Sequence, residues 1–241
     1  MTDNQQSLFS TATSNFQAIP RNAWLLALSV GAMGSTIDVI YWKIGVKPGA
    51  FIAVWLIPAM FGWAAALYIG ATGTVGLTPT RNGYVRFVAT SFVIVSPLVL
   101  TLGVLVLNAP MFSQGYRMGL LALALFIGLV TTALLAAWPM ANAVTGRICS
   151  PLTILGATRG HRWSLFFLTL ATGGVGNSDF IPVMAKAQDI VQAIMIGVGN
   201  AVLGLFPFAF AASIAGAAWQ FAVKNNPDLG IANVPASAPA A

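Results

Sequence analysis

The stretch MGLLALALFIGLVTTALLAAWPMANAVTG, residues 118–146, decides the fold class of this chain. It contains no Asp, Glu, Lys or Arg, and Arg117 and Arg147 bound it on either side. As a helix, these 29 residues would extend about 43 Å, which is longer than the hydrocarbon core of a membrane. We therefore expect a membrane helix that is tilted or protrudes, with a kink at Trp138-Pro139.

The same scarcity of charge extends over the whole chain. Only 7% of the 241 residues are charged and 58% are hydrophobic, whereas soluble domains carry about 25% charged residues. A backbone in lipid must form helices or a closed barrel, and these apolar runs are too long and unbroken for barrel strands. The composition therefore predicts an all-α, polytopic transmembrane helical bundle.

Six apolar regions predict about six membrane spans. We expect them at 22–42, 51–73, 86–108, 118–146, Trp163–Gly176 and 199–222. The fifth region is short for a span, so residues 163–198 are open to three interpretations: a full span, a re-entrant segment or an interfacial helix. The predicted organisation is an N-terminal segment 1–21, a six-helix domain 22–224 and a disordered tail 225–241. The N-terminal segment is polar at first, and its apolar residues share one side of a surface helix: Leu8, Phe9, Ala12 and Phe16.

Segment 148–160 is predicted to be an elbow lying in the membrane interface before the fifth span. Its apolar residues are spaced by four and three, which places them on one face of a helix: Ile148, Leu152 and Leu155. Basic side chains flank it and are candidates for binding lipid headgroups: Arg147, Arg159, His161 and Arg162. Basic residues are also unequally divided between the two predicted sides of the membrane, which favours both termini in the cytoplasm.

A second group of polar residues offers a different chemistry. Within or beside the apolar regions, the candidates for a polar path are Asp38, Asn177, Asp179 and Asn200. Alternatively, Asp38 pairs with a nearby lysine, Asp179 is a solvated loop charge and Asn200 joins two helices through its amide. The glycine-rich stretch at 173–176, followed by Asn177, also resembles the break of a discontinuous transporter helix.

Other kinds of chemistry are not predicted. The chain has one cysteine, Cys149, and one histidine, His161, so we expect no disulfide within the chain, no metal site and no cofactor. Motifs of phosphate-binding loops, zinc proteases and serine hydrolases are missing from the sequence, and we expect no catalytic residue. The basic residues are scattered, so nucleic acid is not an expected partner.

One stretch resembles a known family. Trp138-Pro139-Met140-Ala141-Asn142-Ala143, Ser150-Pro151-Leu152 and Ala157-Thr158-Arg159-Gly160-His161-Arg162-Trp163 are similar to a pattern in bacterial six-span proteins of the glycerophosphoryl-diester-phosphodiesterase membrane-domain-like group. The resemblance covers about 30 residues. It implies a six-helix protein of the bacterial inner membrane with no catalytic residue to carry over.

The sequence thus predicts a non-enzymatic membrane protein with a lipid-associated or accessory role, whose partners are membrane lipids. Two alternatives stay open. One is a small transporter or permease-like protein, and the other is a structural subunit of a larger membrane complex. Membrane-protein partners or a homo-oligomer are compatible with each of these functions.

Overall fold

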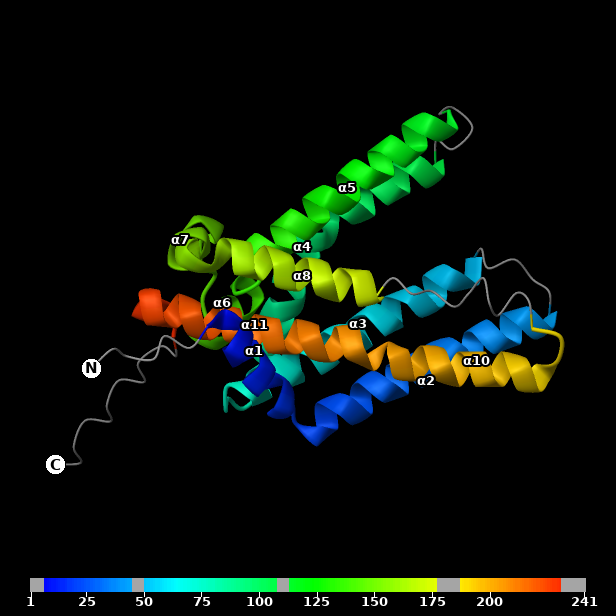
Figure 1. Ribbon diagram of the computed structural model, residues 1–241, viewed down its shortest axis with the longest axis horizontal. Coiled ribbons are helices and arrows are strands. Elements are labelled where there is room, and N and C mark those ends of the chain that lie inside the picture. The colour runs from blue at the N-terminus through cyan, green and yellow to red at the C-terminus, as the bar shows by residue number, and fades with distance from the viewer. Residues whose placement is uncertain (1–6, 45–49, 108–112, 177–186, 231–241) are drawn as a thin grey trace. The chain divides into compact units, whose positions relative to one another are not determined.

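The computed structural model describes residues 7–44, 50–107, 113–176 and 187–230, which are almost entirely helical (Figure 1). The α-helices are α1 (Leu8–Gln17), α2 (Arg21–Ile44), α3 (Ala50–Thr74), α4 (Arg81–Leu107), α5 (Gln114–Leu134), α6 (Trp138–Thr145), α7 (Pro151–Ala157), α8 (Arg162–Gly176), α10 (Ile190–Leu203) and α11 (Leu205–Asn225). Two 3-10 turns are η2 (Arg159–His161) and η3 (Pro227–Leu229). None of the described residues lies in a strand, so the predicted all-α class is confirmed for this part of the chain.

Three of the described helical segments are long and apolar enough to cross a membrane. By length and composition these are Arg21–Ile44, Gln114–Leu134 and Ile190–Asn225. The last segment combines α10 and α11, which meet at Gly204. That the chain crosses the membrane six times, and that the elbow lies in the membrane interface, stay predictions.

The stretch 118–146 lies in two helices, α5 and α6, rather than in the single kinked helix expected. The N–H of Leu135 closes α5 by donating to the carbonyl of Thr131 (2.9 Å). Pro139, in the first turn of α6, has no N–H with which to continue the helical ladder. α6 then ends at Thr145 and is followed by Gly146, whose φ of 71° is a left-handed conformation that favours glycine.

The N-terminal helix α1 is buried along part of the apolar side that the sequence predicts. Leu8 and Ala12, one helical turn apart, are both buried, whereas Phe9 is 67% exposed. The four residues still lie within about 100° around the helix axis, so Phe9 stands at the exposed edge of the side that Leu8 and Ala12 bury. The amide of Asn15 also lies inside and donates to the carbonyl of Ser213 (3.4 Å).

The chain divides into two compact units. Unit 1 contains the described residues of Met1–Thr11, Thr80–Leu170 and Ile214–Ala241, and unit 2 contains those of Ala12–Pro79 and Ala171–Ser213. Helices α1, α8 and α11 contribute residues to both units.

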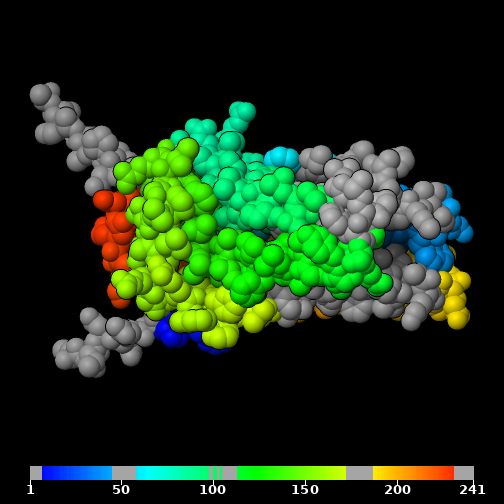
Figure 2. All heavy atoms as spheres, turned by 90° about the horizontal axis from the view of Figure 1, so that it is seen from above, coloured from blue at the N-terminus to red at the C-terminus, as the bar shows by residue number. Residues whose placement is uncertain are grey.

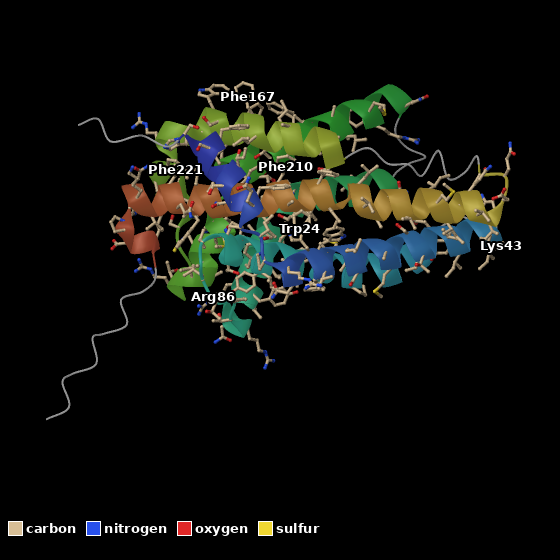
Figure 3. The ribbon with its side chains drawn as sticks, turned by 60° about the horizontal axis from the view of Figure 1, so that its bottom comes forward. Trp24, Lys43, Arg86, Phe167, Phe210 and Phe221 are labelled. Carbon is tan, nitrogen blue, oxygen red and sulfur yellow. The ribbon has the colours of Figure 1, made fainter. Side chains whose placement is uncertain are left out.

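Small residues and aromatic rings pack the interior of unit 2, where α2 lies against α3 and α10. Its buried core consists of Ile19, Ala23, Ala27, Ala66, Phe208, Ala209 and Ala212. The Trp24 ring meets the edge of Phe208 with centroids 5.6 Å apart, and Figure 3 shows Trp24 beside α11. A Cβ on Gly73 would lie 2.5 Å from Cγ of Pro20, so these two segments touch only because position 73 has no side chain.

In unit 1, α4 packs along α5 and against α6. Figure 2 shows α4 and α5 side by side on one face. The largest fully buried apolar side chains of this unit are Met140, Ile154, Leu165 and Leu229. Ile154 lies in the elbow, Met140 in the helix before it and Leu229 in the turn after α11. The elbow therefore contributes a side chain to the packed interior of unit 1.

Candidate functional site

The start of the elbow, between α6 and α7, is fixed through both backbone groups of Cys149. The N–H of Cys149 donates to Oδ1 of Asn142 (2.6 Å), and Nε1 of Trp138 donates to the carbonyl of Cys149 (2.8 Å). The amide nitrogen of Asn142 donates in turn to the hydroxyl of Thr90 on α4 (2.8 Å). Asn142 is only 2% exposed, so water does not compete for these bonds. The elbow is therefore held on both α4 and α6.

The short helix α7 has a polar start and a buried inner face. The hydroxyl of Ser150 caps it by accepting a hydrogen bond from the N–H of Leu152 (3.3 Å). Ile154 and Ala157 are buried, and the buried hydroxyl of Thr158 donates to the carbonyl of Ile154 (2.9 Å). This face fixes the orientation of α7, so its opposite face is the exposed one.

The end of α11 and η3 hold the elbow from the C-terminal side. Nδ2 of Asn225 donates to the carbonyl of Ala157 (2.7 Å), and Nη2 of Arg147 donates to the carbonyl of Asp228 (2.9 Å). Leu229 is 1% exposed. Residues 225–230, which the sequence places in a disordered tail, are thus ordered by contacts with the elbow, while residues 231–241 lie outside the described part.

The four predicted headgroup ligands all lie on or beside the elbow, but they differ in what they already bind. Arg159 is exposed. The imidazole ring of His161 lies against Phe221, with centroids 4.2 Å apart; Figure 3 labels Phe221 on α11. Nη2 of Arg162 donates to the carbonyl of Leu155 (2.6 Å), and its Nε is buried with no hydrogen-bond partner among the described residues. Arg159 is therefore the base most available to a ligand.

Large apolar side chains are exposed among these bases. Ile148 is 85% exposed, and Leu152 and Trp163 are each 74% exposed. Trp163 stacks on Phe167 with ring centroids 6.2 Å apart, and Figure 3 shows Phe167 pointing away from the ribbon. Bases mixed with exposed aliphatic and aromatic side chains are typical of surfaces that lie in a membrane interface. The predicted apolar face is thus exposed at Ile148 and Leu152, while Leu155 is half-buried.

The charge of unit 1 has one dominant sign. Its described residues include one acid, Asp228, and seven bases: Arg81, Arg86, Arg117, Arg147, Arg159, Arg162 and Lys224. Arg86 lies close to the elbow, because a Cβ on Gly146 would be 3.2 Å from Nη1 of Arg86. An anionic ligand would therefore meet little electrostatic repulsion at this end of unit 1.

The predicted polar path is not assembled by the described residues. Asp38 on α2 is half-buried and already interacts with another group. Asn200 lies on α10, and its Oδ1 is buried without a hydrogen-bond partner in the described structure. Its neighbour Ala201 lies against Gly31 of α2. Asp38 follows Gly31 by seven residues, so Asn200 and Asp38 are separated by about two helical turns along the axis of α2. Asn177 and Asp179 lie outside the described residues.

Sequence reasoning found the bases of the elbow but missed the residues that hold it, above all Asn142. A signal was present, since Asn142 is the only amide side chain in residues 118–146, and an amide in an apolar run needs a partner. That partner is Thr90, which lies 52 residues away in the sequence. The spacing of residues around Asn142 therefore could not identify it.

Comparison with known proteins does not assign this chain to a family. No known protein family matches the chain, and neither a curated protein nor a solved structure is detectably similar to it. The resemblance of residues 138–163 to a bacterial six-span group stays a prediction. Function must be argued from the geometry of this chain.

Proposed function

We propose that this chain is a multi-pass protein of the bacterial inner membrane, without catalytic activity of its own, whose elbow binds anionic lipid headgroups. Both termini are cytoplasmic in this proposal. The observation that supports it best is the joint exposure of the base Arg159 and of two large apolar side chains that flank it in the sequence, Leu152 and Trp163. An accessory role follows from this assignment, because the elbow binds lipid without changing it.

Two physical effects favour lipid binding there. Each basic side chain near an anionic leaflet contributes about 1 kcal/mol of attraction, and the exposed apolar side chains are stabilised by entering the acyl boundary. The hydrogen bonds to Cys149 fix the loop before any lipid arrives. Binding therefore requires little additional ordering of the backbone, which raises affinity.

A charge-matched pair of double variants tests the proposal. We compare Arg147→Gln/Arg159→Gln with Arg21→Gln/Arg81→Gln, which removes two exposed arginines from outside the elbow. Retention of phosphatidylglycerol is measured by native mass spectrometry of the full-length protein in detergent. We expect about 25-fold weaker retention in the elbow variant, from the loss of two such attractions. Equal retention in the two variants would overturn the proposal.

One observation favours a second candidate function, a small transporter. Oδ1 of Asn200 is a buried acceptor without a partner among the described residues, and such an oxygen can bind a cation or a donor group of a solute. In that case, exchanging K⁺ for Na⁺, or adding a solute, should raise the thermal midpoint of the wild type and leave Asn200→Leu unchanged. A protein that instead co-purifies with a defined partner would favour a structural subunit.

A further inference from the structure

Helices α2 and α10 form an open apolar groove in unit 2, with a volume of about 530 Å³. Small residues line it, and two of them, Gly197 and Ala201, are buried, whereas Ala32 is exposed. Larger side chains make its walls, among them Leu28, Ile40 and Ile194, and all three are exposed. The volume falls within the range of about 300–1,000 Å³ that is usual for ligand pockets.

The two helices run antiparallel in a register that the glycine contacts define. A Cβ on Gly31 would lie 3.4 Å from Cα of Ala201, and a Cβ on Gly197 would lie 3.4 Å from Cβ of Ser35. Continued for two further turns, this register places Lys43 at the level of Asp189. Figure 3 agrees, since it shows Lys43 at the end of α2 beside the start of α10.

The length of the groove matches one leaflet of a membrane. From Leu28 to Ile40 it extends about 18 Å at the rise of an α-helix, and one leaflet of hydrocarbon is about 15 Å thick. Tyr41 and Trp42 follow directly at one end, and such aromatic side chains prefer the level of the headgroups. One end of the groove therefore lies at an interface when α2 crosses a membrane, and the other lies near the middle.

Opposite charges stand at the interfacial end. Lys43 is exposed and follows Thr36 and Ile40 at helical spacing, so it lies on the groove face of α2. Asp189 is exposed at the start of α10, where one carboxylate oxygen accepts from the N–H of Gln192 (2.8 Å). A phosphate is complementary to Lys43, and a primary ammonium group is complementary to Asp189.

We propose that this groove binds one acyl chain of a phospholipid with a zwitterionic phosphate–ammonium headgroup. The phosphate lies at Lys43 and the ammonium at Asp189, while the chain covers Gly197 and Ala201. The proposal requires that α2 and α10 lie in a membrane. It does not require headgroup binding by the elbow.

The test uses full-length protein in mild detergent, with phosphatidylethanolamine as the probe and native mass spectrometry as the readout. Thr36→Phe places a ring in the groove, and the matched control Met33→Phe places the same ring on an exposed face of α2 outside it. We expect Thr36→Phe to lose the retained lipid and Met33→Phe to keep it. Lys43→Gln, which leaves the groove open, should weaken retention by up to about fivefold, the loss of one exposed ion pair with the phosphate.

Several outcomes would overturn this inference. Thr36→Phe and Lys43→Gln both retaining phosphatidylethanolamine would do so, as would preferential retention of phosphatidylglycerol at the groove. A dimer that Thr36→Phe converts to a monomer would show that a second copy covers the groove. The elbow variant Arg147→Gln/Arg159→Gln should keep phosphatidylethanolamine, so failure of one proposal can be told from failure of the other.

Discussion

The elbow of unit 1 and the α2–α10 pair of unit 2 are held together by different kinds of interaction. At the start of the elbow the chain leaves helical structure, and the side chains of Asn142 and Trp138 bind the backbone of Cys149. Along α2 and α10 the backbone groups are satisfied within each helix, and small residues such as Gly197 permit close packing. Polar side chains are thus needed where the helical ladder ends, because unpaired backbone groups away from water are costly.

This difference predicts opposite sensitivities in the two units. Unit 1 should respond most strongly to the loss of a single polar group, whereas unit 2 should respond most strongly to the addition of a methyl group. The variants that follow are ordered by the expected change in the free energy of unfolding. That quantity can be measured by circular dichroism in mixed micelles of dodecylmaltoside and dodecyl sulfate.

The largest effect is expected for Asn142→Ala. The change removes the bonds to Cys149 and Thr90 and leaves a buried N–H without its acceptor, so we expect a loss of about 3 kcal/mol. Asn82→Ala is the matched control, because Asn82 is exposed at the start of α4. A loss no larger than that of the control would show that polar bonds do not fix the elbow.

A smaller effect is expected for Gly73→Ala in unit 2. The added methyl group would lie 2.5 Å from Cγ of Pro20, and a proline ring has little freedom to move away. We expect overpacking to reduce stability by about 2 kcal/mol. In Gly119→Ala the new methyl group meets no atom within 4 Å, and a helical alanine should instead be neutral or slightly stabilising. Equal behaviour of the two variants would contradict close packing in unit 2.

The sequence was most informative where a single physical constraint acts. Long uncharged runs predict helices, and the described residues are helical. The sequence correctly predicts a break in the helix near Trp138-Pro139. It does not predict that the helix ends at Leu134 and that a separate helix begins at Trp138. Proline limits only the local ladder, whereas the separate helix α6 also depends on Asn142 meeting Thr90 on α4.

The candidate site could be predicted only in part for the same reason. The bases around the elbow are visible as local composition, and the structure places all four in unit 1. Which of them is available to a ligand depends on distant partners, since Arg147 binds the carbonyl of Asp228, 81 residues away. The groove of α2 and α10 was missed altogether, because its two walls come from opposite parts of the chain.

The turn after α11 offers a milder test of how the elbow is held. In Trp219→Phe the ring stays apolar, but the bond from Nε1 to the carbonyl of Leu229 (3.0 Å) is lost. We expect a loss of about 1 kcal/mol, the usual net value of one hydrogen bond. Trp163→Phe is the control, because that ring is exposed. An unchanged stability in Trp219→Phe would show that the turn contributes nothing to holding unit 1.

The smallest effect is expected for Leu152→Gln, and its dependence on the surroundings is the informative result. Leu152 is 74% exposed on the outer face of α7, whereas Ile154 on the inner face is fully buried. In detergent, Leu152→Gln should change the free energy of unfolding by less than about 0.5 kcal/mol. In nanodiscs of phosphatidylglycerol, Leu152→Gln should lower the thermal midpoint below that of the wild type, because glutamine stabilises the acyl boundary contact less than leucine does. The same midpoint for both proteins in nanodiscs would mean that the outer face of α7 does not enter the membrane interface, and the elbow would then differ in solvent from the lipid surroundings proposed for the α2–α10 groove.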